Sequence, residues 1–131
     1  TEHFVGHGVA DPAPIRIEGT LHVFATSRAN ILHLTGEPLE ARATLSGATV
    51  PFPILIDGEL HLLAQQAVNG RRQPVLARLN LTTPNRRPTW RPLLPMGDLA
   101  ACTSPVMGRH PTTGEWLLLC VEERAPTDYR P

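Results

Sequence analysis

The sequence predicts an all-β fold of repeated four-stranded antiparallel meanders, arranged as a partial β-propeller. The first observation is an internal repeat, because Ile15–Ser27 reads IRIEGTLHVFATS and Ile54–Gln66 reads ILIDGELHLLAQQ, a shift of 39 residues (54 − 15). A looser third copy, Gly114–Cys120, aligns with Gly58–Ala64. Periods of roughly 20–50 residues are typical of solenoids, propellers and arrays. The second observation is the 10 Gly and 14 Pro spread through the chain, which disfavour long helices.

Each full copy of the repeat starts with a predicted β-hairpin. Apolar residues alternate with Arg16 over positions 15–17, and a Glu-Gly pair at 18–19 then interrupts the alternation, as an Asp-Gly pair does at 57–58. Such pairs are strong hairpin signals because a tight turn needs positive φ, which Gly adopts freely. The strand after each turn is apolar on both faces, so we expect both faces to be covered.

Further strands are expected after each hairpin, at residues 30–34 and 41–45 in the first unit and at 75–81 and 89–94 in the second. The third copy has a short strand at 106–108, a longer turn at His110–Gly114 and a strand at Glu115–Val121. These segments divide one domain, residues 1–131, into units of about 10–46, 50–95 and 104–123. A β-sandwich or an irregular barrel is the alternative arrangement.

The number of units predicts self-association. Propellers close with four or more blades, whereas this sequence shows two units and part of a third. Open strand edges and apolar faces invite pairing, so we expect a homo-oligomer.

The composition limits the classes of binding partner that we expect. The 12 basic and 12 acidic residues give zero net charge, which favours neither nucleic acid nor an anionic membrane. No apolar run approaches the roughly 20 residues of a membrane helix, so a soluble protein is expected. No signal peptide is visible in the chain, and its location stays open. Cys102 and Cys120 fit either one disulfide or two free thiols.

A family resemblance appears once the units are compared with known propellers. The segment Ala10–Ser27, ADPAPIRIEGTLHVFATS, resembles the first blade of the five-bladed arabinanase-like glycosidases, and Val50–Leu60 looks like the next blade. The second unit is also similar to a propeller domain found with certain formyltransferase-like and glycosyltransferase-like proteins. Residues 104–106 and Gly114–Leu117 fit the third blade of either group. The resemblance implies a propeller fold over most of residues 9–122.

The resemblance also carries an implied function, because the Asp of the Ala-Asp-Pro motif is the general base in those glycosidases and Asp11 matches it. The family has a further Asp in the third blade, where this chain has Ser104, and a general-acid Glu in a blade that the chain does not clearly contain. Glycoside hydrolysis uses two carboxyl groups. The incomplete set favours a noncatalytic module that binds a carbohydrate or small ligand. The alternative is a glycoside hydrolase whose site is completed by oligomerisation, with Asp11 as base.

The candidate ligand-binding residues are Asp11, Arg28, Ser104 and Trp90. Asp11 is the residue that the repeat does not reproduce, since Pro51 or Phe52 takes its place in the second copy and Ser104 in the third. Its other interpretation is a turn carboxylate that accepts backbone N–H groups. Trp90 fits either a sugar-stacking role or a core anchor.

The histidines give structural predictions. His22 and His61 hold equivalent repeat positions, which indicates packing with a hydrogen bond to a neighbouring strand. His3, His7 and Asp11 are four residues apart, but the Gly and Pro residues around them break the helix that would bring them together. We therefore predict no metal site and no cofactor.

Overall fold

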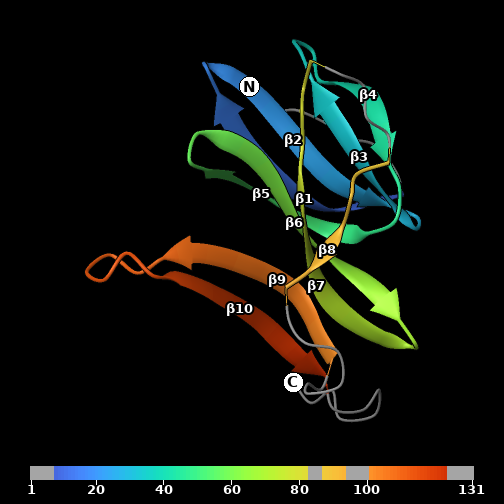
Figure 1. Ribbon diagram of the computed structural model, residues 1–131. Coiled ribbons are helices and arrows are strands. Elements are labelled where there is room, and N and C mark those ends of the chain that lie inside the picture. The colour runs from blue at the N-terminus through green and yellow to red at the C-terminus, as the bar shows by residue number, and fades with distance from the viewer. Residues whose placement is uncertain (1–7, 83–86, 94–100, 124–131) are drawn as a thin grey trace.

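The computed structural model describes residues 8–82, 87–93 and 101–123, and these residues form antiparallel sheets without a helix (Figure 1). The first sheet has the order β1-β2-β3-β4 and the second the order β5-β6-β7-β8, so each is the predicted four-stranded meander. A third sheet pairs β10 with β9. The strands are β1 (Val9–Ile17), β2 (Thr20–Ser27), β3 (Asn30–Thr35), β4 (Glu40–Leu45), β5 (Thr49–Ile56), β6 (Glu59–Val68), β7 (Arg71–Arg78), β8 (Arg91–Pro92), β9 (Ala101–Arg109) and β10 (Trp116–Glu123).

The predicted hairpin turns are confirmed. Glu18 and Gly19 have φ of 49° and 82°, and Asp57 and Gly58 have φ of 50° and 77°. Two consecutive positive φ values identify the type I′ turn, whose twist matches that of the flanking strands. In the third sheet the turn is longer, and Gly114 N–H donates to the His110 carbonyl at 2.9 Å.

Some strand boundaries differ from the prediction. The strand expected at 75–81 is β7, which begins four residues earlier, at Arg71, and ends at Arg78. The strand expected at 89–94 is the two-residue β8, and residue 94 lies outside the described residues. The Asn-Gly pair at 69–70 extends β6 and β7 as a hairpin, since Asn69 and Gly70 also have positive φ.

Both faces of the central strands are covered, as predicted. Consecutive residues Val23, Phe24 and Ala25 of β2 are buried, as are residues 62–64 of β6. Phe24 and Leu62 belong to one core cluster between the first two sheets. Burying such side chains contributes about 25 cal/mol per Å² of apolar surface removed from water.

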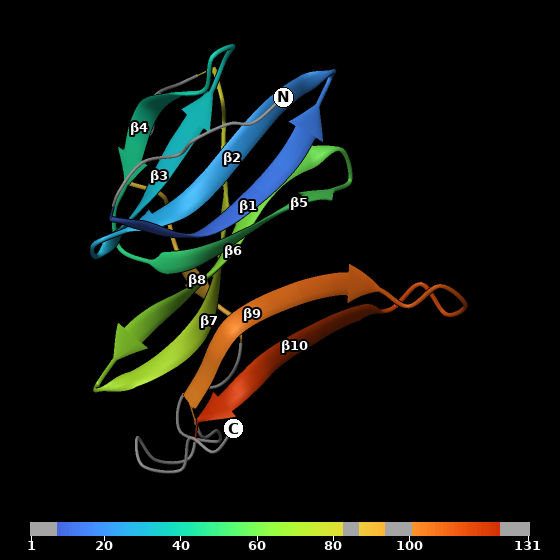
Figure 2. The same ribbon diagram turned by 180° about the vertical axis from the view of Figure 1, so that it is seen from behind.

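The three sheets follow one another in space as they do in the sequence (Figures 1 and 2). β5, the first strand of the second sheet, packs against β1, β2 and β3 of the first. β9, the first strand of the third sheet, packs against β5, β6 and β7 of the second. The first strand of each later sheet is therefore a docking strand that covers the preceding sheet. The described strands form an open array and not a closed barrel.

Each docking strand, and β1 with them, contains a β-bulge near its start. The register skips two residues between Ala10 and Ala13 in β1, between Thr49 and Phe52 in β5, and between Thr103 and Val106 in β9. The first skipped residue has positive φ in every case: 53° at Asp11, 53° at Val50 and 50° at Ser104. Left-handed backbone is uncommon outside Gly and a strong outlier for a β-branched residue such as Val.

The bulges correct one prediction from the sequence. The counterpart of Asp11 in the second unit is Val50, and neither Pro51 nor Phe52 holds that place. The counterpart in the third unit is Ser104, as expected. The 39-residue shift of the repeat leads to the same counterpart (11 + 39 = 50), because the bulge falls at the same place in both strands and leaves the alignment unchanged.

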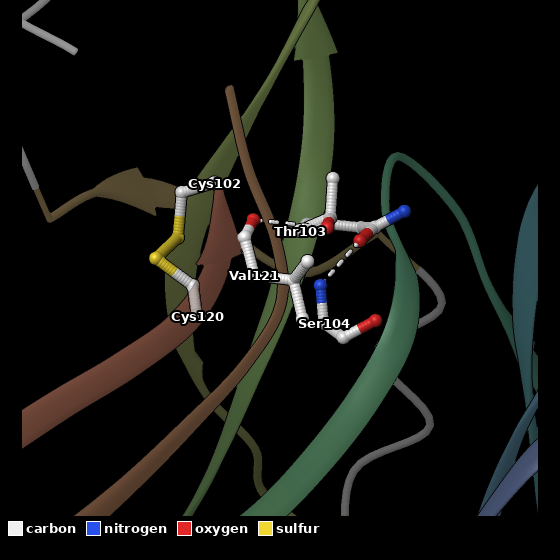
Figure 3. The surroundings of a disulfide bond; sticks show 6 residues. Cys102, Thr103, Ser104, Cys120 and Val121 are labelled. Carbon is white, nitrogen blue, oxygen red and sulfur yellow. Dashed lines mark hydrogen bonds between the residues drawn. A yellow bond between two sulfur atoms is a disulfide. The ribbon is translucent and has the colours of Figure 1, made fainter. Parts of the chain in front are cut away.

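The bulges also carry the hydrogen bonds that join one sheet to the next. The Val50 N–H donates to Thr26 Oγ1 of β2 at 2.8 Å. The Ser104 N–H donates to Gln65 Oε1 of β6 at 2.9 Å (Figure 3). Thr26 and Gln65 are themselves repeat equivalents, 39 residues apart (65 − 26). The same docking contact is thus made twice.

A disulfide crosses the third sheet beside its bulge. Cys102 of β9 bonds Cys120 of β10, with 5.4 Å between the Cα atoms, and Thr103 and Ser104 lie next to it (Figure 3). Of the two states that the sequence allowed, the structure has the disulfide. It links the strands of the sheet that has the fewest of them.

Candidate functional site

The structure separates the residues that the sequence singled out. Asp11 and Ser104 are exposed at equivalent bulges, but Asp11 lies in the first sheet and Ser104 in the third. Arg28 is exposed in the turn between β2 and β3, with φ of 59°. His3 and His7 lie outside the described residues. Among the described residues, no group of three or more His, Cys, Asp or Glu side chains could hold a metal ion.

Trp90 has a packing role. Its side chain packs against the main core, and its indole N–H donates to the Ser46 carbonyl at 2.8 Å. The ring also lies against Gly47, where an added Cβ would stand 3.0 Å from the ring atoms Cδ1 and Nε1. These contacts correspond to the core-anchor interpretation of Trp90 and not to an open stacking platform.

A cavity of about 310 Å³ opens elsewhere, between strands β2, β3 and β4 of the first sheet and the segment that follows β7. Its polar lining comes from His22, His33, Thr35, Arg42 and Asn80, and its apolar lining from Phe24, Ala43, Leu45, Leu79 and Leu81. None of the four predicted ligand-binding residues lines this cavity.

Two histidines form the polar centre of the cavity. His22 Nδ1 and His33 Nε2 are 2.9 Å apart and share a hydrogen bond. The His33 ring stacks on Phe24, with ring centroids 4.7 Å apart and planes at 10°. Because antiparallel partners share a face, the pairing of Phe24 with His33 brings both side chains to the side that looks toward the second sheet. His22 makes the hydrogen bond to the neighbouring strand that was predicted for both His22 and His61, but the two residues do not share this contact, since His61 Nδ1 contacts the Glu59 carbonyl of its own strand.

Burial disfavours the charged forms of both histidines and lowers the pKa of each. Loss of hydration, reinforced by the positive charge of a protonated His22 and of Arg42, lowers the pKa of His33 to about 4. Burial also lowers the pKa of His22. In a neutral pair one N–H is shared between the rings, whichever ring carries it. The two outer ring nitrogens are then one donor and one acceptor.

The remaining polar groups of the cavity lining are mostly hydrogen-bond donors. Arg42 lies 3.6 Å from Glu40 in an ion pair whose side chains are both more than half exposed, so that pair is weak. Asn80 Oδ1 accepts from the N–H and the hydroxyl of Thr82, which leaves the Asn80 NH₂ as its donor group. The Thr35 hydroxyl donates to the Leu21 carbonyl and keeps acceptor capacity. The lining can therefore bind a ligand rich in oxygen atoms.

The second sheet has a hollow at the equivalent place, of about 580 Å³, lined in part by His61, Leu76, Arg78 and Arg91. His61 pairs with Arg78 as His22 pairs with Thr35, and Leu63 pairs with Leu76 as Phe24 pairs with His33. The histidine pair is not repeated, since His33 becomes Leu76 and His61 Nδ1 instead contacts the Glu59 carbonyl. The repeat thus places two hollows on consecutive sheets but gives them different chemistry.

The sequence did not point to His33, because no repeat copy shares it. Its signal was the register of β2 and β3, since a two-residue turn at 28–29 places position 33 opposite Phe24. That turn has Arg28 at positive φ, without the Gly that marks the other hairpins. Asn80 and Leu81 were missed because they line the cavity from the segment after β7, which is far from β2 and β3 in the sequence.

Comparisons with known proteins give no relative. No protein-family model, no curated protein and no solved structure matches the chain. Within the described ranges, no helix is long and apolar enough to cross a membrane.

Proposed function

We propose that the protein is a binding module for a small carbohydrate-like ligand, held in the cavity of the first sheet. The observation that carries the proposal is the neutral His22–His33 pair in a cavity that is otherwise lined by apolar side chains and by the hydrogen-bond donors of Arg42 and Asn80. A sugar hydroxyl is both donor and acceptor, and the outer nitrogens of the pair offer one of each.

The rest of the cavity supports an oxygen-rich ligand with apolar surfaces. The Arg42 guanidinium and the Asn80 amide are directional donors for hydroxyl, ring or carboxylate oxygens. Phe24, Leu79 and Leu81 provide apolar contact for the C–H faces of a sugar ring. Ligand sites are commonly apolar hollows with a few placed polar groups, and a volume of about 310 Å³ fits a small ligand.

The positions of the carboxyl groups favour binding over hydrolysis. Glycosidases flank the scissile bond with two carboxyl groups. Asp11 does not line the cavity, and its equivalents at the bulges of the other sheets are Val50 and Ser104, which have no carboxyl group. A glycoside hydrolase with Asp11 as base is the alternative, and it would need a second carboxyl group brought beside Asp11.

The test is a titration followed by amide chemical shifts, with arabinose, xylose, mannose and glucuronic acid as probes. We expect saturable shifts at His33 and Asn80 for at least one probe. Arg42→Ala and Asn80→Ala remove exposed donors and should weaken that binding about tenfold or more, which corresponds to one lost hydrogen bond to a charged or polar donor.

The matched control is His110→Ala, which removes a histidine from the tip of the β9–β10 hairpin. Its binding should equal that of the unchanged protein. Absence of saturable shifts with all probes would contradict the proposal, and so would binding that Arg42→Ala and Asn80→Ala leave unchanged. Release of sugar from aryl arabinosides, lost in Asp11→Asn, would establish the hydrolase alternative.

A further inference from the structure

The strand β10 presents a row of exposed apolar side chains. Val106 of β9 and Leu119 of β10 are direct partners and share one face of the third sheet with Leu117 and Val121. Their exposed fractions are 39%, 64%, 43% and 60%, respectively. We call these four residues the β10 face. Contiguous exposed apolar surface of this kind marks an interaction site.

The repeat shows what covers this face in the other two sheets. The counterparts of Leu119 are Phe24 in the first sheet and Leu63 in the second, as the strand pairings establish. Both counterparts are 0% exposed. They lie on the sides covered by the docking strands, β5 over the first sheet and β9 over the second. The β10 face is therefore the one surface of its kind, among the described sheets, that has no docking strand on it.

The first sheet exposes the complementary surface. Pro53 of β5 is buried and shares a face with Leu62, which packs toward the first sheet. Pro51 of β5 and Pro105 of β9, which hold one repeat position, are buried as well. In β1 the equivalents of these prolines are Pro12 and Pro14, and both are exposed.

The face of the first sheet that is directed away from the second sheet is exposed at its β1 edge. Pro14 pairs with Val23, so the two share the face directed away from the second sheet, and Val23 is buried. In the edge strand β1, Asp11, Pro12 and Pro14 are exposed. The equivalent positions of β5 and β9 are the ones through which those two strands dock.

We propose that the β10 face of one molecule binds β1 of a second copy of the same chain, in the geometry by which β5 and β9 already dock. The partner is assigned by continuity, since β1 has the bulge and the prolines of a docking strand. Zero net charge removes repulsion between copies. This interface uses different surfaces on the two partners, so it is heterologous and produces a ring or an open filament.

The new interface lacks one hydrogen bond that the internal ones make. Val121 stands where Thr26 and Gln65 accept the bulge N–H of the next sheet. The docked Asp11 N–H would thus face an apolar side chain. We expect a reversible association, weaker than the docking within the chain, because that hydrogen bond is missing. The inference does not depend on the proposed ligand site, which lies on other residues.

The experiment measures molar mass by sedimentation equilibrium over a concentration series. The unchanged protein should give masses above that of the monomer, which rise with concentration. Leu119→Glu places a charge on the β10 face and Pro14→Glu places one on β1, so each should sediment as a monomer. Leu55→Glu is the control, because Leu55 is an exposed leucine outside both surfaces, with an exposed fraction of 42% beside 43% for Leu117, and it should associate like the unchanged protein.

Mixing the two interface variants tests the geometry. A Leu119→Glu molecule keeps a functional β1, and a Pro14→Glu molecule keeps a functional β10 face, so an equimolar mixture should form a dimer and nothing larger. The circular dichroism spectrum and the melting temperature of each variant alone must match those of the unchanged protein. If Leu119→Glu does not fold, Leu119→Asn replaces it in the same experiment. A monomeric unchanged protein at all concentrations overturns the proposal. Dimers that persist in Pro14→Glu alone, or a mixture that stays monomeric, overturn it equally.

Discussion

The buried histidine pair is the residue-scale feature with the clearest consequence. The folded protein holds the pKa of His33 at about 4, below the value of about 6.5 for an exposed histidine. The contribution of His33 to stability is fully present above pH 6.5, where neither the folded nor the unfolded protein binds the proton well. Below that pH the unfolded chain takes up the proton first, so the contribution is lost as the pH falls toward 4.

This linkage predicts a drop in the free energy of unfolding between pH 7 and pH 4. At about 1.4 kcal/mol per pKa unit, the difference between 6.5 and about 4 sets an upper bound of about 3.5 kcal/mol, and solvent around the partly exposed His33 reduces the expected size to the order of 2 kcal/mol. Urea unfolding at pH 7, 5 and 4 measures it. His33→Leu is a suitable variant because the second sheet has Leu76 at this place. Its pH dependence should be shallower, and an unchanged slope would remove the histidine pair from the explanation.

Gly47 provides a second test at this scale. Its φ is 97°, and an added Cβ would lie 3.0 Å from Trp90 ring atoms. Gly47→Ala should therefore cost about 2–4 kcal/mol, from the unfavourable backbone and the displaced indole. Gly58→Ala is the control, because its φ is 77° but an added Cβ meets nothing within 4 Å. The melting temperature of Gly47→Ala should be well below that of Gly58→Ala. Equal losses of stability in the two variants would contradict the packing role of Trp90.

At the scale of the element, the β9–β10 hairpin depends most on a covalent link. An isolated two-stranded hairpin is marginal in water, and this one keeps an exposed apolar face. The Cys102–Cys120 disulfide closes a loop with a sequence separation of 18 residues, which stabilises by about 3 kcal/mol in the chain-entropy estimate.

Reduction should therefore loosen this hairpin before the rest of the molecule. With a reductant, amide exchange is expected to accelerate in β9 and β10, while β2 and β6 keep their protection because they are covered on both faces. The double variant Cys102→Ala, Cys120→Ala should behave like the reduced protein. Uniform acceleration across all three sheets would show that the molecule unfolds as one unit.

The elements were predicted from the sequence to the extent that their signals are local. The Glu18-Gly19 and Asp57-Gly58 turns and the apolar strands after them were predicted correctly, because turn chemistry and burial pattern act within a few residues. The bulges were not predicted, since Val50 has none of the usual signs of left-handed backbone. The candidate cavity was missed for a different reason. It joins His33 to Asn80 across two sheets, and docking between sheets leaves no local signature.

At the scale of the whole molecule, the repeat is a repeated docking contact as well as a repeated hairpin. The bulges of β5 and β9 each turn a backbone N–H toward an acceptor on the preceding sheet: Val50 toward Thr26 and Ser104 toward Gln65. Positive φ at a non-Gly residue costs of order 1–3 kcal/mol, so the surrounding contacts must enforce it. The proposed binding cavity also depends on this docking, since the segment that follows β7 of the second sheet lines it together with the first sheet.

The most direct test of this account is amide hydrogen exchange at Val50 and Ser104. Both amides should exchange slowly in the unchanged protein. Gln65→Leu should accelerate Ser104 by about tenfold or more and leave Val50 unchanged, and Thr26→Val should do the reverse, because each removes one acceptor worth about 1–2 kcal/mol. If both amides already exchange at the rate of exposed positions, or if neither variant acts on its own partner alone, the three sheets are not docked by one repeated contact.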